Sequence, residues 1–171
     1  MVALAGVALA GCLGEGDHLV GSTLANGNAV PGLWHSAGGD GCYWARRDPF
    51  GNIIANSFSI AGPQYAEVKP TDAYFSTSGC AVWVQVDQAF DTKHVITTFG
   101  QFADGQYRVG PEVPTGTYFA TTPLSCYWER TRDFSGDFSA LIDNGLNGAA
   151  TILPGDVGFS SSGCGIWTKV G

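Results

Sequence analysis

Basic side chains are scarce in this sequence. Only 8 of its 171 residues are lysine or arginine, against 15 aspartates and glutamates. Charged residues make up 13% of the chain, about half the usual fraction. No basic stripe is available to neutralise a row of phosphates, which argues against nucleic acid as a partner. The carboxylates are scattered, so the net charge of −7 indicates a solubilising surface and identifies no partner.

Long apolar segments and helical periodicity are also missing. The apolar run over residues 2–10 is too short to cross a bilayer as a helix. No stretch sustains an apolar period of 3.6 residues, which predicts little helix. What the chain does have is 44% hydrophobic residues, which excludes a disordered chain, and 25 glycines, which fit many tight turns between short strands.

The first residues resemble an export signal. The apolar run leads into Leu9-Ala10-Gly11-Cys12, which resembles the bacterial lipoprotein box, in which the signal is cut before the cysteine and the cysteine is lipidated. We therefore assign residues 1–12 to a signal and lipobox segment, with Cys12 as the lipidation site. No lysine or arginine precedes the apolar run, so we expect a truncated signal whose start lies further upstream. The alternative is that Cys12 is an odd thiol in a plain signal or a buried segment.

One pattern occurs twice along the chain. Residues 42–46, Cys-Tyr-Trp-Ala-Arg, recur as residues 126–130, Cys-Tyr-Trp-Glu-Arg. Residues 78–83, Ser-Gly-Cys-Ala-Val-Trp, recur as residues 162–167, Ser-Gly-Cys-Gly-Ile-Trp, at the same offset (126 − 42 = 84; 162 − 78 = 84). A sequence unit duplicated in this way is expected to form the same supersecondary structure twice. The predicted parts after the signal are a first β-repeat over 13–90, a connecting segment over 91–104 and a second β-repeat over 105–171.

The cysteines indicate an exported, oxidised domain. Setting Cys12 aside leaves Cys42 and Cys80 in the first repeat and Cys126 and Cys164 in the second, each pair 38 residues apart (80 − 42 = 38; 164 − 126 = 38). Evenly duplicated cysteines in an exported chain indicate a disulfide framework. Of the three possible pairings, the duplication favours one bridge inside each repeat, because a unit that once stood alone could bridge only internally. Zinc is the weaker alternative, since no two cysteines have ligand spacing. We expect no metal and no cofactor.

Short β-prone runs broken by glycine, proline, asparagine and aspartate fill both repeats. Their spacing of about 8–12 residues is typical of an antiparallel sandwich or barrel. The predicted fold is all-β, with two tandem antiparallel β-sandwich or jelly-roll-like repeats, each with one internal disulfide. We expect two similar lobes packed together; one larger shared core is the alternative. The predicted strands lie near 18–21, 33–36, 42–46, 53–58, 65–69 and 82–86, then near 107–110, 117–120, 126–130, 138–142, 149–153 and 166–170, with a crossover strand over 95–99.

Alternation along each strand predicts which side chains face the core. Cys80 must point inward to meet its partner, so Trp83 is expected to point outward and to be half-exposed, and Trp167 likewise. A bulge after the Ser-Gly-Cys turn would reverse this orientation. Counted from the first cysteine of each repeat, Trp44 and Trp128 belong to the core and pack on the disulfides.

Exposed indoles are the first candidates for a binding site. A flat apolar face with one N–H donor suits a sugar ring or a partner protein. We therefore name Trp83 and Trp167 as a candidate aromatic platform, which Tyr43 and Tyr127, on the outer side of their strands, would extend. The alternatives are that the two tryptophans seal the contact between the lobes or cover a second sheet, and that the tyrosines are ordinary surface aromatics.

Two arginine–aspartate pairs recur with the repeat. Arg46 and Asp72 in the first repeat correspond to Arg130 and Asp156 in the second. A bidentate clasp at the strand ends explains both pairs. The alternatives are capture of a carboxylate or phosphate ligand by the arginines and, as a weaker signal, a contribution of the aspartates to a calcium site.

Signatures of catalysis are not found. None of the three histidines, His18, His35 and His94, recurs in the other repeat, and the position that matches His35 is Phe119. The sequence has no nucleophile elbow, no His-Glu-x-x-His and no phosphate-binding glycine loop. A hydrolase that uses His35 or His94 with a nearby aspartate is the enzymatic alternative.

The second repeat resembles a known sequence unit. Residues 105–110 (Gly-Gln-Tyr-Arg-Val-Gly), 113–118 (Val-Pro-Thr-Gly-Thr-Tyr), 126–130 and 159–167 together are similar to a repeat of secreted proteins and lipoproteins of actinobacteria. The first repeat matches more loosely, since its Val-Pro-Gly over 30–32 lacks one residue. The resemblance implies an exported β-rich surface module and carries over no catalytic or binding residue.

These observations predict a protein that is secreted or held on the extracellular face of the cell membrane by its lipid anchor alone. The predicted role is non-catalytic binding to a cell-wall polysaccharide or a surface protein. A purely structural or assembly role at the cell surface is the alternative.

Overall fold

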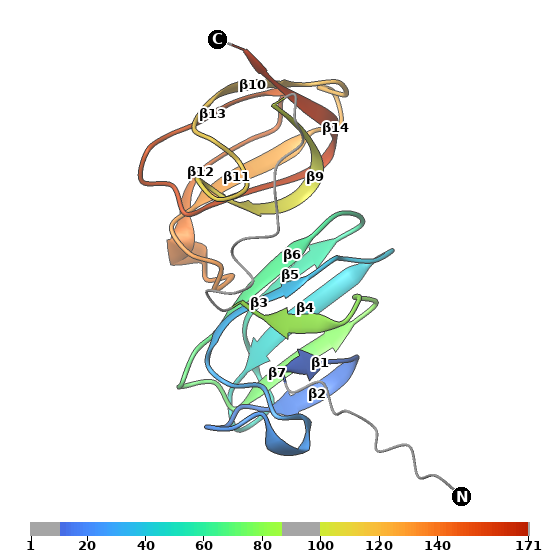
Figure 1. The fold of residues 1–171 in the computed structure, drawn as a ribbon, viewed down its shortest axis with the longest axis vertical. Helices are drawn as coiled ribbons and strands as arrows, with labels where there is room; N and C mark the ends of the chain where they lie inside the picture. The colour runs from blue at the N-terminus through green and yellow to red at the C-terminus, as the bar shows by residue number, and fades with distance from the viewer. Residues whose placement is uncertain (1–10, 87–99, 171) are drawn as a thin grey trace, which may run out of the picture.

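The computed structural model describes residues 11–86 and 100–170, which form two stacked lobes of β-strands (Figure 1). The first lobe, drawn in blue to green, comes from the first repeat, and the second, in yellow to red, from the second repeat. All three sheets are antiparallel. Within these described ranges no helix is both long enough and apolar enough to pass through a membrane. The expected all-β class is confirmed.

Eight strands build the first lobe. They pair in a nested order, first with last, so that β1 bonds β8, β2 bonds β7, β3 bonds β6 and β4 bonds β5. This long hairpin is wound into two four-stranded sheets, with orders β1-β8-β3-β6 and β2-β7-β4-β5. The strands are β1 (Cys12–Leu13), β2 (Gly16–Leu19), β3 (Gly32–Ser36), β4 (Cys42–Arg47), β5 (Ile53–Ser59), β6 (Gln64–Val68), β7 (Tyr74–Ser78) and β8 (Trp83–Gln85).

The second lobe repeats this pairing within a single sheet. Its β9 bonds β14, β10 bonds β13 and β11 bonds β12. The long β14 takes the place of β7 and β8 together, and β9 takes that of β1 and β2, so one continuous six-stranded sheet replaces the two sheets of the first lobe. The strands are β9 (Gln101–Arg108), β10 (Gly116–Ala120), β11 (Tyr127–Thr131), β12 (Leu141–Gly145), β13 (Ala149–Ile152) and β14 (Gly158–Val170).

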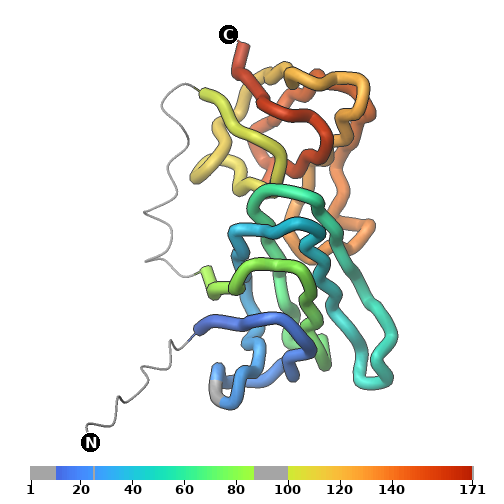
Figure 2. Tube along the Cα trace, turned by 90° about the vertical axis from the view of Figure 1, so that its right-hand side faces the viewer, coloured from blue at the N-terminus to red at the C-terminus, as the bar shows by residue number. Residues whose placement is uncertain are grey.

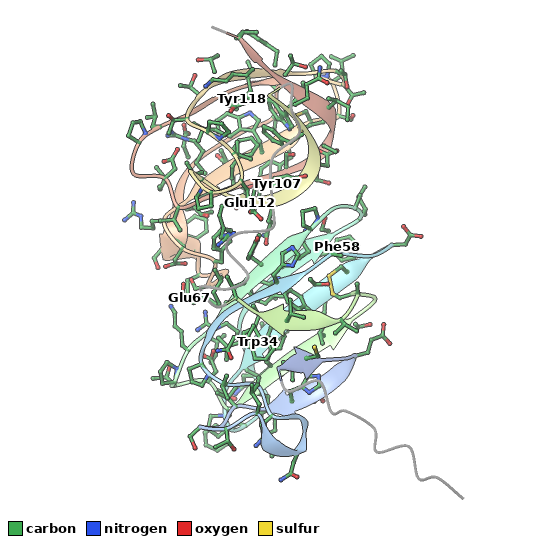
Figure 3. The ribbon with its side chains drawn as sticks, viewed as in Figure 1. Trp34, Phe58, Glu67, Tyr107, Glu112 and Tyr118 are labelled. Carbon is green, nitrogen blue, oxygen red and sulfur yellow. A yellow bond between two sulfur atoms is a disulfide. The ribbon has the colours of Figure 1, made fainter. Side chains whose placement is uncertain are left out.

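Each lobe has its own apolar core and its own disulfide. The bridges join Cys42 to Cys80 and Cys126 to Cys164, as the duplication predicts. All five tryptophans of the sequence are buried, and each belongs to the core of its own lobe. The expected positions of Trp44 and Trp128 in the cores are therefore confirmed. In Figure 3, Trp34 and Tyr118 mark the interiors of the first and second lobes.

The expected exposure of Trp83 and Trp167 is wrong, because both side chains are 0% exposed. The Ser-Gly-Cys turn breaks the alternation: in the first lobe β7 ends at Ser78 and the chain crosses to the other sheet before β8 begins at Trp83. In the second lobe the register between β14 and β9 shifts between Ser161 and Ile166. The bulge alternative is therefore the one that the structure adopts. The two indoles occupy the cores and form no surface platform.

Strand boundaries differ from the prediction in four places. Strand β7 lies in a segment to which no strand was assigned, and β9 begins at Gln101, inside the segment assigned to the connection. Cys12 pairs with Val84 and Leu13 is buried, so the fold begins before residue 13. The 3₁₀ turn Phe138–Ala140 precedes β12 where a strand was expected from 138. The predicted crossover strand over 95–99 lies outside the described residues.

Candidate binding cleft between the lobes

A loop of the second lobe, residues 132–140, reaches the first lobe (Figure 2). The hairpin β4–β5 spans nine positions from Arg46 to its partner Ala55 (55 − 46 = 9). Its counterpart β11–β12 spans thirteen from Arg130 to Asp143 (143 − 130 = 13), so it is four residues longer. Shortening elsewhere restores the common offset of 84, which hides this insertion in the sequence. We call residues 132–140 the clasp loop.

The clasp loop docks through its backbone and one aromatic ring. Phe134 is buried, with its ring centroid 4.9 Å from that of Tyr65 in β6. The backbone N–H of Glu67 donates to the carbonyl oxygen of Phe134 at 2.9 Å. Arg46 of β4 donates from Nη1 to the carbonyl oxygen of Ser135 at 2.6 Å. These contacts fix the loop against the edge of the first lobe.

Asp137 adds a charged contact to the clasp loop. Its carboxylate pairs with Nζ of Lys69 and lies 3.5 Å from Nη1 of Arg46. Burial acts to raise the pKa of Asp137, but the hydrogen bonds from Lys69 and Ser135 and the charges of Arg46 and Lys69 outweigh it, so the pKa is lowered. The cations of the first lobe thereby neutralise this carboxylate of the second.

A second set of contacts joins β6 to the start of the second lobe. The hydroxyl of Tyr65 donates to Oε1 of Glu112 at 2.5 Å, and the Tyr65 backbone N–H donates to Oε1 of Gln106 at 2.8 Å. The other carboxylate oxygen of Glu112 accepts from the backbone N–H of Arg108 at 2.7 Å. Figure 3 shows Glu112 and Tyr107 at this junction. Burial raises the pKa of Tyr107 to about 12, so its hydroxyl stays protonated at physiological pH.

Beside the clasp loop lies a cleft of about 310 Å³, which is lined by residues of both lobes. One wall is the outer face of the second lobe's sheet, where Gln106, Ser160, Glu129 and Asn144 form one row across β9, β14, β11 and β12. Tyr127 and Thr131 flank Glu129 on the same face of β11. The opposite wall is the edge strand β5, through Asn56 and Ser57, and the clasp loop closes one end with Phe134 and the exposed Phe138.

Trp44 lies where the clasp loop meets the first lobe. It is 1% exposed, it lines the cleft, and its indole N–H has no hydrogen-bond partner among the described residues. Gly136 of the clasp loop has φ +72°, and a Cβ there would lie 2.7 Å from Cη2 of Trp44. Glycine is therefore required at 136 both for the backbone conformation and for the close approach of the loop. A buried donor without an acceptor is a position where a water or a ligand oxygen is stabilising.

Glu129 is the titratable group in the middle of the cleft wall. Its counterpart in the first repeat is Ala45, so the carboxyl group belongs to the second repeat alone. Burial raises the pKa of Glu129, and a hydrogen bond with Tyr127 partly offsets this effect. The cleft thus holds a carboxyl group in surroundings that favour its protonated form.

The substitution Glu129→Gln is expected to make the protein more stable at pH 7 and to have little effect well below the pKa of a free glutamate. Because the folded-state pKa is raised, the folded protein binds more protons than the unfolded chain in the window between the two pKa values. The stability that the wild type has at low pH is therefore lost as the pH rises through the folded-state pKa, whereas glutamine loses none. Thermal unfolding of both proteins between pH 3 and pH 8 measures this difference. A melting temperature that falls in the variant at pH 7 would contradict the sign.

The lining of the cleft favours a neutral, hydroxyl-rich ligand. None of the described residues that line it is lysine or arginine. The polar groups are amides, hydroxyls and carboxyls, and aromatic rings stand beside them, as in sites that hold small polar molecules by a few directed hydrogen bonds. An anionic ligand would meet Glu129, Asp133 and Asp137 without a cation in the lining. The arrangement fits a carbohydrate.

Of the four aromatics proposed from the sequence, only Tyr127 lines this cleft. Trp83 and Trp167 are in the cores, where Trp83 Nε1 donates to Oγ1 of Thr77 at 2.8 Å and Trp167 Nε1 to Oγ of Ser161 at 3.0 Å. They do not seal the contact between the lobes either. Tyr43 is half-buried on the outer face of the first lobe, opposite Phe58.

The predicted arginine–aspartate clasps are present. Arg46 holds Asp72 through Nε at 2.8 Å and Nη2 at 3.1 Å, which is a bidentate pair. Arg130 contacts Asp156 through Nη1 alone, at 3.3 Å, and reaches Asp143 with Nη2 at 3.3 Å. The second clasp is therefore confirmed as an ion pair but not as a bidentate one.

The remaining candidate residues lie away from the cleft. His35 is buried against Tyr65, with ring centroids 4.8 Å apart, and does not line the cleft. His94 lies outside the described residues. Cys12 is a half-buried free thiol in β1. In the part of the chain that the structure describes, no three histidine, cysteine, aspartate or glutamate side chains are grouped as metal ligands.

Sequence reasoning missed most of the cleft residues, among them Glu129, Asn144 and Phe138. Glu129 carries a signal in the sequence, because it is the one position where the two Cys-Tyr-Trp-x-Arg motifs differ. Phe138 lies on the insertion that the equal offsets conceal. Asn144 gives no signal by itself.

Comparison with known proteins adds one match. The model of a family described as the Rv1352-like extracellular domain matches residues 11–84 and 100–168, one segment in each lobe. No curated protein and no solved structure matches the chain.

Proposed function

The chain belongs to the Rv1352-like extracellular domain family, and on that premise we propose that it is a non-catalytic binding module whose cleft holds a neutral carbohydrate of the cell wall. The observation that carries the proposal is a row of polar side chains that faces the cleft between aromatic rings, with no lysine or arginine among the described lining residues: Gln106, Ser160, Glu129 and Asn144. Amides and carboxyls placed side by side offer donors and acceptors in the pattern that vicinal hydroxyls need.

Two further features support this function. The two lobes and the clasp loop enclose the cleft, so its walls are held by backbone hydrogen bonds and ion pairs and need little rearrangement on binding. The row lies on β-strands, which position side chains more rigidly than loops do.

We further propose that lipid attachment at Cys12 holds the module at the outer face of the membrane. Cys12 begins β1 and Leu13 is already buried in the first lobe, so the anchor would be attached directly to the folded domain with almost no tether. The mass of the membrane-extracted protein tests this directly: a mass without acyl chains on Cys12 would rule out the anchor.

The substitution Tyr127→Ala is expected to weaken binding of short neutral oligosaccharides at least tenfold. The ring lines the cleft beside Glu129, and its loss removes both an apolar surface and a hydroxyl. The measurement is calorimetric titration with neutral disaccharides of glucose, mannose, galactose, arabinose and N-acetylglucosamine. The matched control is Tyr43→Ala, which removes the equivalent tyrosine of the first repeat and leaves the lining of the cleft intact.

The two variants distinguish a cleft from a general loss of fold. Both tyrosines are half-buried on equivalent strands, so both variants should unfold at similar temperatures. Equal loss of binding in the two variants would argue against the cleft as the site. If the wild-type protein binds none of the sugars and does bind an anionic polymer, the carbohydrate proposal is wrong.

A further inference from the structure

We propose that the carbohydrate bound here is an extended polysaccharide chain, which runs from the cleft along the outer face of the first lobe and stacks on Phe58 and Tyr43. The inference rests on the proposed carbohydrate-binding function and adds the length of the ligand and a second contact region. The inference starts from strand β5, which forms one wall of the cleft and also carries Phe58.

Strand β5 belongs both to the cleft and to the open face. Asn56 lines the cleft, and Phe58 lies two residues further along the same strand. Residues two apart in a strand point to the same side and lie about 7 Å apart. A ligand that contacts Asn56 in the cleft therefore needs to extend by only this distance to reach the ring of Phe58. Figure 3 shows Phe58 on the first lobe near the second.

Phe58 and Tyr43 form a cross-strand aromatic pair. They are register partners in the antiparallel ladder of β4 and β5, so their Cβ atoms lie about 5 Å apart on one face. Phe58 is 62% exposed, and Tyr43 is half-buried. A phenylalanine this exposed on a sheet face contributes little to the core, whereas its ring offers a flat surface for the apolar face of a sugar.

The repeat places one tyrosine at each part of this path. Tyr127 in the cleft and Tyr43 on the open face occupy the same position on the outer faces of equivalent strands. The first lobe covers part of the outer face of the second lobe and creates the cleft there, whereas on its own equivalent face, among the described residues, Phe58 is exposed and Tyr43 is half-buried. A chain that passes from one face to the other thus meets a tyrosine in both places.

The charges near this path are compatible with the same occupant. Among the described residues the cleft lining has no lysine or arginine, and the ladder neighbours of Tyr43 are Phe58 and Ser78, both uncharged. Arg47, on the same face of β4, is held by hydrogen bonds to Ser76 and Gly51. Asn56 separates the two regions with an amide, which donates and accepts hydrogen bonds with hydroxyl groups. A neutral polysaccharide matches this arrangement, because each sugar ring has hydroxyl groups for the polar cleft and the Asn56 amide, and an apolar face for the rings of Phe58 and Tyr43.

The test compares short and long ligands of one chemistry. Calorimetric titrations use the di- and hexasaccharides of β-1,4-linked N-acetylglucosamine and of α-1,6-linked mannose. The wild-type protein is expected to bind the hexasaccharide about tenfold more tightly than the disaccharide. Phe58→Ala is expected to remove this gain and to leave disaccharide binding unchanged, and Tyr43→Ala to reduce the gain. The control is Phe50→Ala, since Phe50 is 89% exposed and does not line the cleft.

The outcomes separate this inference from the function on which it rests. Equal affinity for both lengths in the wild type, with no effect of Phe58→Ala, would overturn the extended path while the cleft remains a sugar site. Absence of binding for every sugar would overturn both proposals. If Phe58→Ala lowers the affinity for a protein isolated from the cell surface and not for the hexasaccharide, the open face binds a protein and the inference is wrong.

Discussion

The substitution Arg46→Met is expected to lower the free energy of unfolding by about 3–5 kcal/mol, as does removal of one partner from a buried ion pair. Arg46 is 2% exposed and the side chain of Asp72 is 0% exposed. Burial acts to lower the pKa of Arg46, but Asp72 and Asp137 outweigh it and raise it, so the guanidinium stays charged. Without this guanidinium, the Asp72 carboxylate keeps, among the described residues, only the hydrogen bond from the backbone N–H of Lys69.

The same arginine also joins the two lobes. Its Nη1 atom donates to the carbonyl oxygen of Ser135 on the clasp loop, so Arg46→Met removes a contact between lobes as well as the ion pair. The matched control is Arg130→Met, because Arg130 is the repeat equivalent and its contacts with Asp156, Asp143 and Thr151 all lie in its own lobe. Urea unfolding should show the larger loss for Arg46→Met.

A double variant isolates the cost of the unpaired charge. Arg46→Met with Asp72→Asn should regain part of the lost stability, because the amide needs no counter-charge and its oxygen still accepts from the Lys69 backbone N–H. Equal destabilisation by Arg46→Met and Arg130→Met would show that the contact with Ser135 contributes nothing. A double variant less stable than Arg46→Met would contradict the charge argument.

The disulfides and the arginine clasps were predictable because each depends on residues that recur at one offset. Each cysteine pair recurs 84 positions later, so each copy of the repeat contains both cysteines of its own disulfide. In the same way, each copy contains both the arginine and the aspartate of its ion pair. Covalent and charge constraints of this kind act between few atoms, so residue identity and spacing are enough to find them. The pairings of Cys42 with Cys80 and of Cys126 with Cys164 follow directly.

The orientation of Trp83 and Trp167 was not predictable from alternation alone. The prediction carried the period of two through the Ser-Gly-Cys turn, where the backbone leaves that period. Gly79 and Gly163 have φ of +67° and +69°, a conformation that shifts the register and turns each indole to the core. The recurring glycine in the sequence is a signal of the bulge, but it does not give the direction of the side chain that follows.

The cleft was not predictable from the sequence either, but for a different reason than the orientation of the two tryptophans. It forms where two lobes meet, and its closing element is an insertion of four residues that compensating changes hide from the common offset. The raised pKa of Glu129 has the same origin, because the surroundings that bury this carboxyl group come from the fold and not from neighbours in the sequence. From the sequence, only Tyr127 as a surface aromatic and the difference between Glu129 and Ala45 point to the site.

The substitutions Trp83→Ala and Trp167→Ala are each expected to cost about 3–5 kcal/mol of unfolding free energy, the range for loss of a large buried aromatic. Each indole is 0% exposed and packs edge-to-face on a phenylalanine, Phe75 at 5.4 Å and Phe159 at 5.4 Å. Each also donates to a hydroxyl, of Thr77 or Ser161, which loses this donor in the variant, although the Ser161 hydroxyl still donates to Asp104. Urea unfolding of the single variants measures these losses.

The double variant Trp83→Ala/Trp167→Ala should not fold. The two side chains belong to separate cores, so their costs add to about 6–10 kcal/mol, a large part of the about 5–15 kcal/mol that a domain has in total. Trp83→Phe, which keeps an aromatic ring but not the hydrogen bond, should fold and lose less. If the double variant folds with an unchanged melting temperature, the indoles are not core residues, and the hypothesis that they form an exposed binding platform is favoured again. If it unfolds, loss of ligand binding in that variant reports loss of the fold, and Tyr127 is the side chain through which binding must be tested.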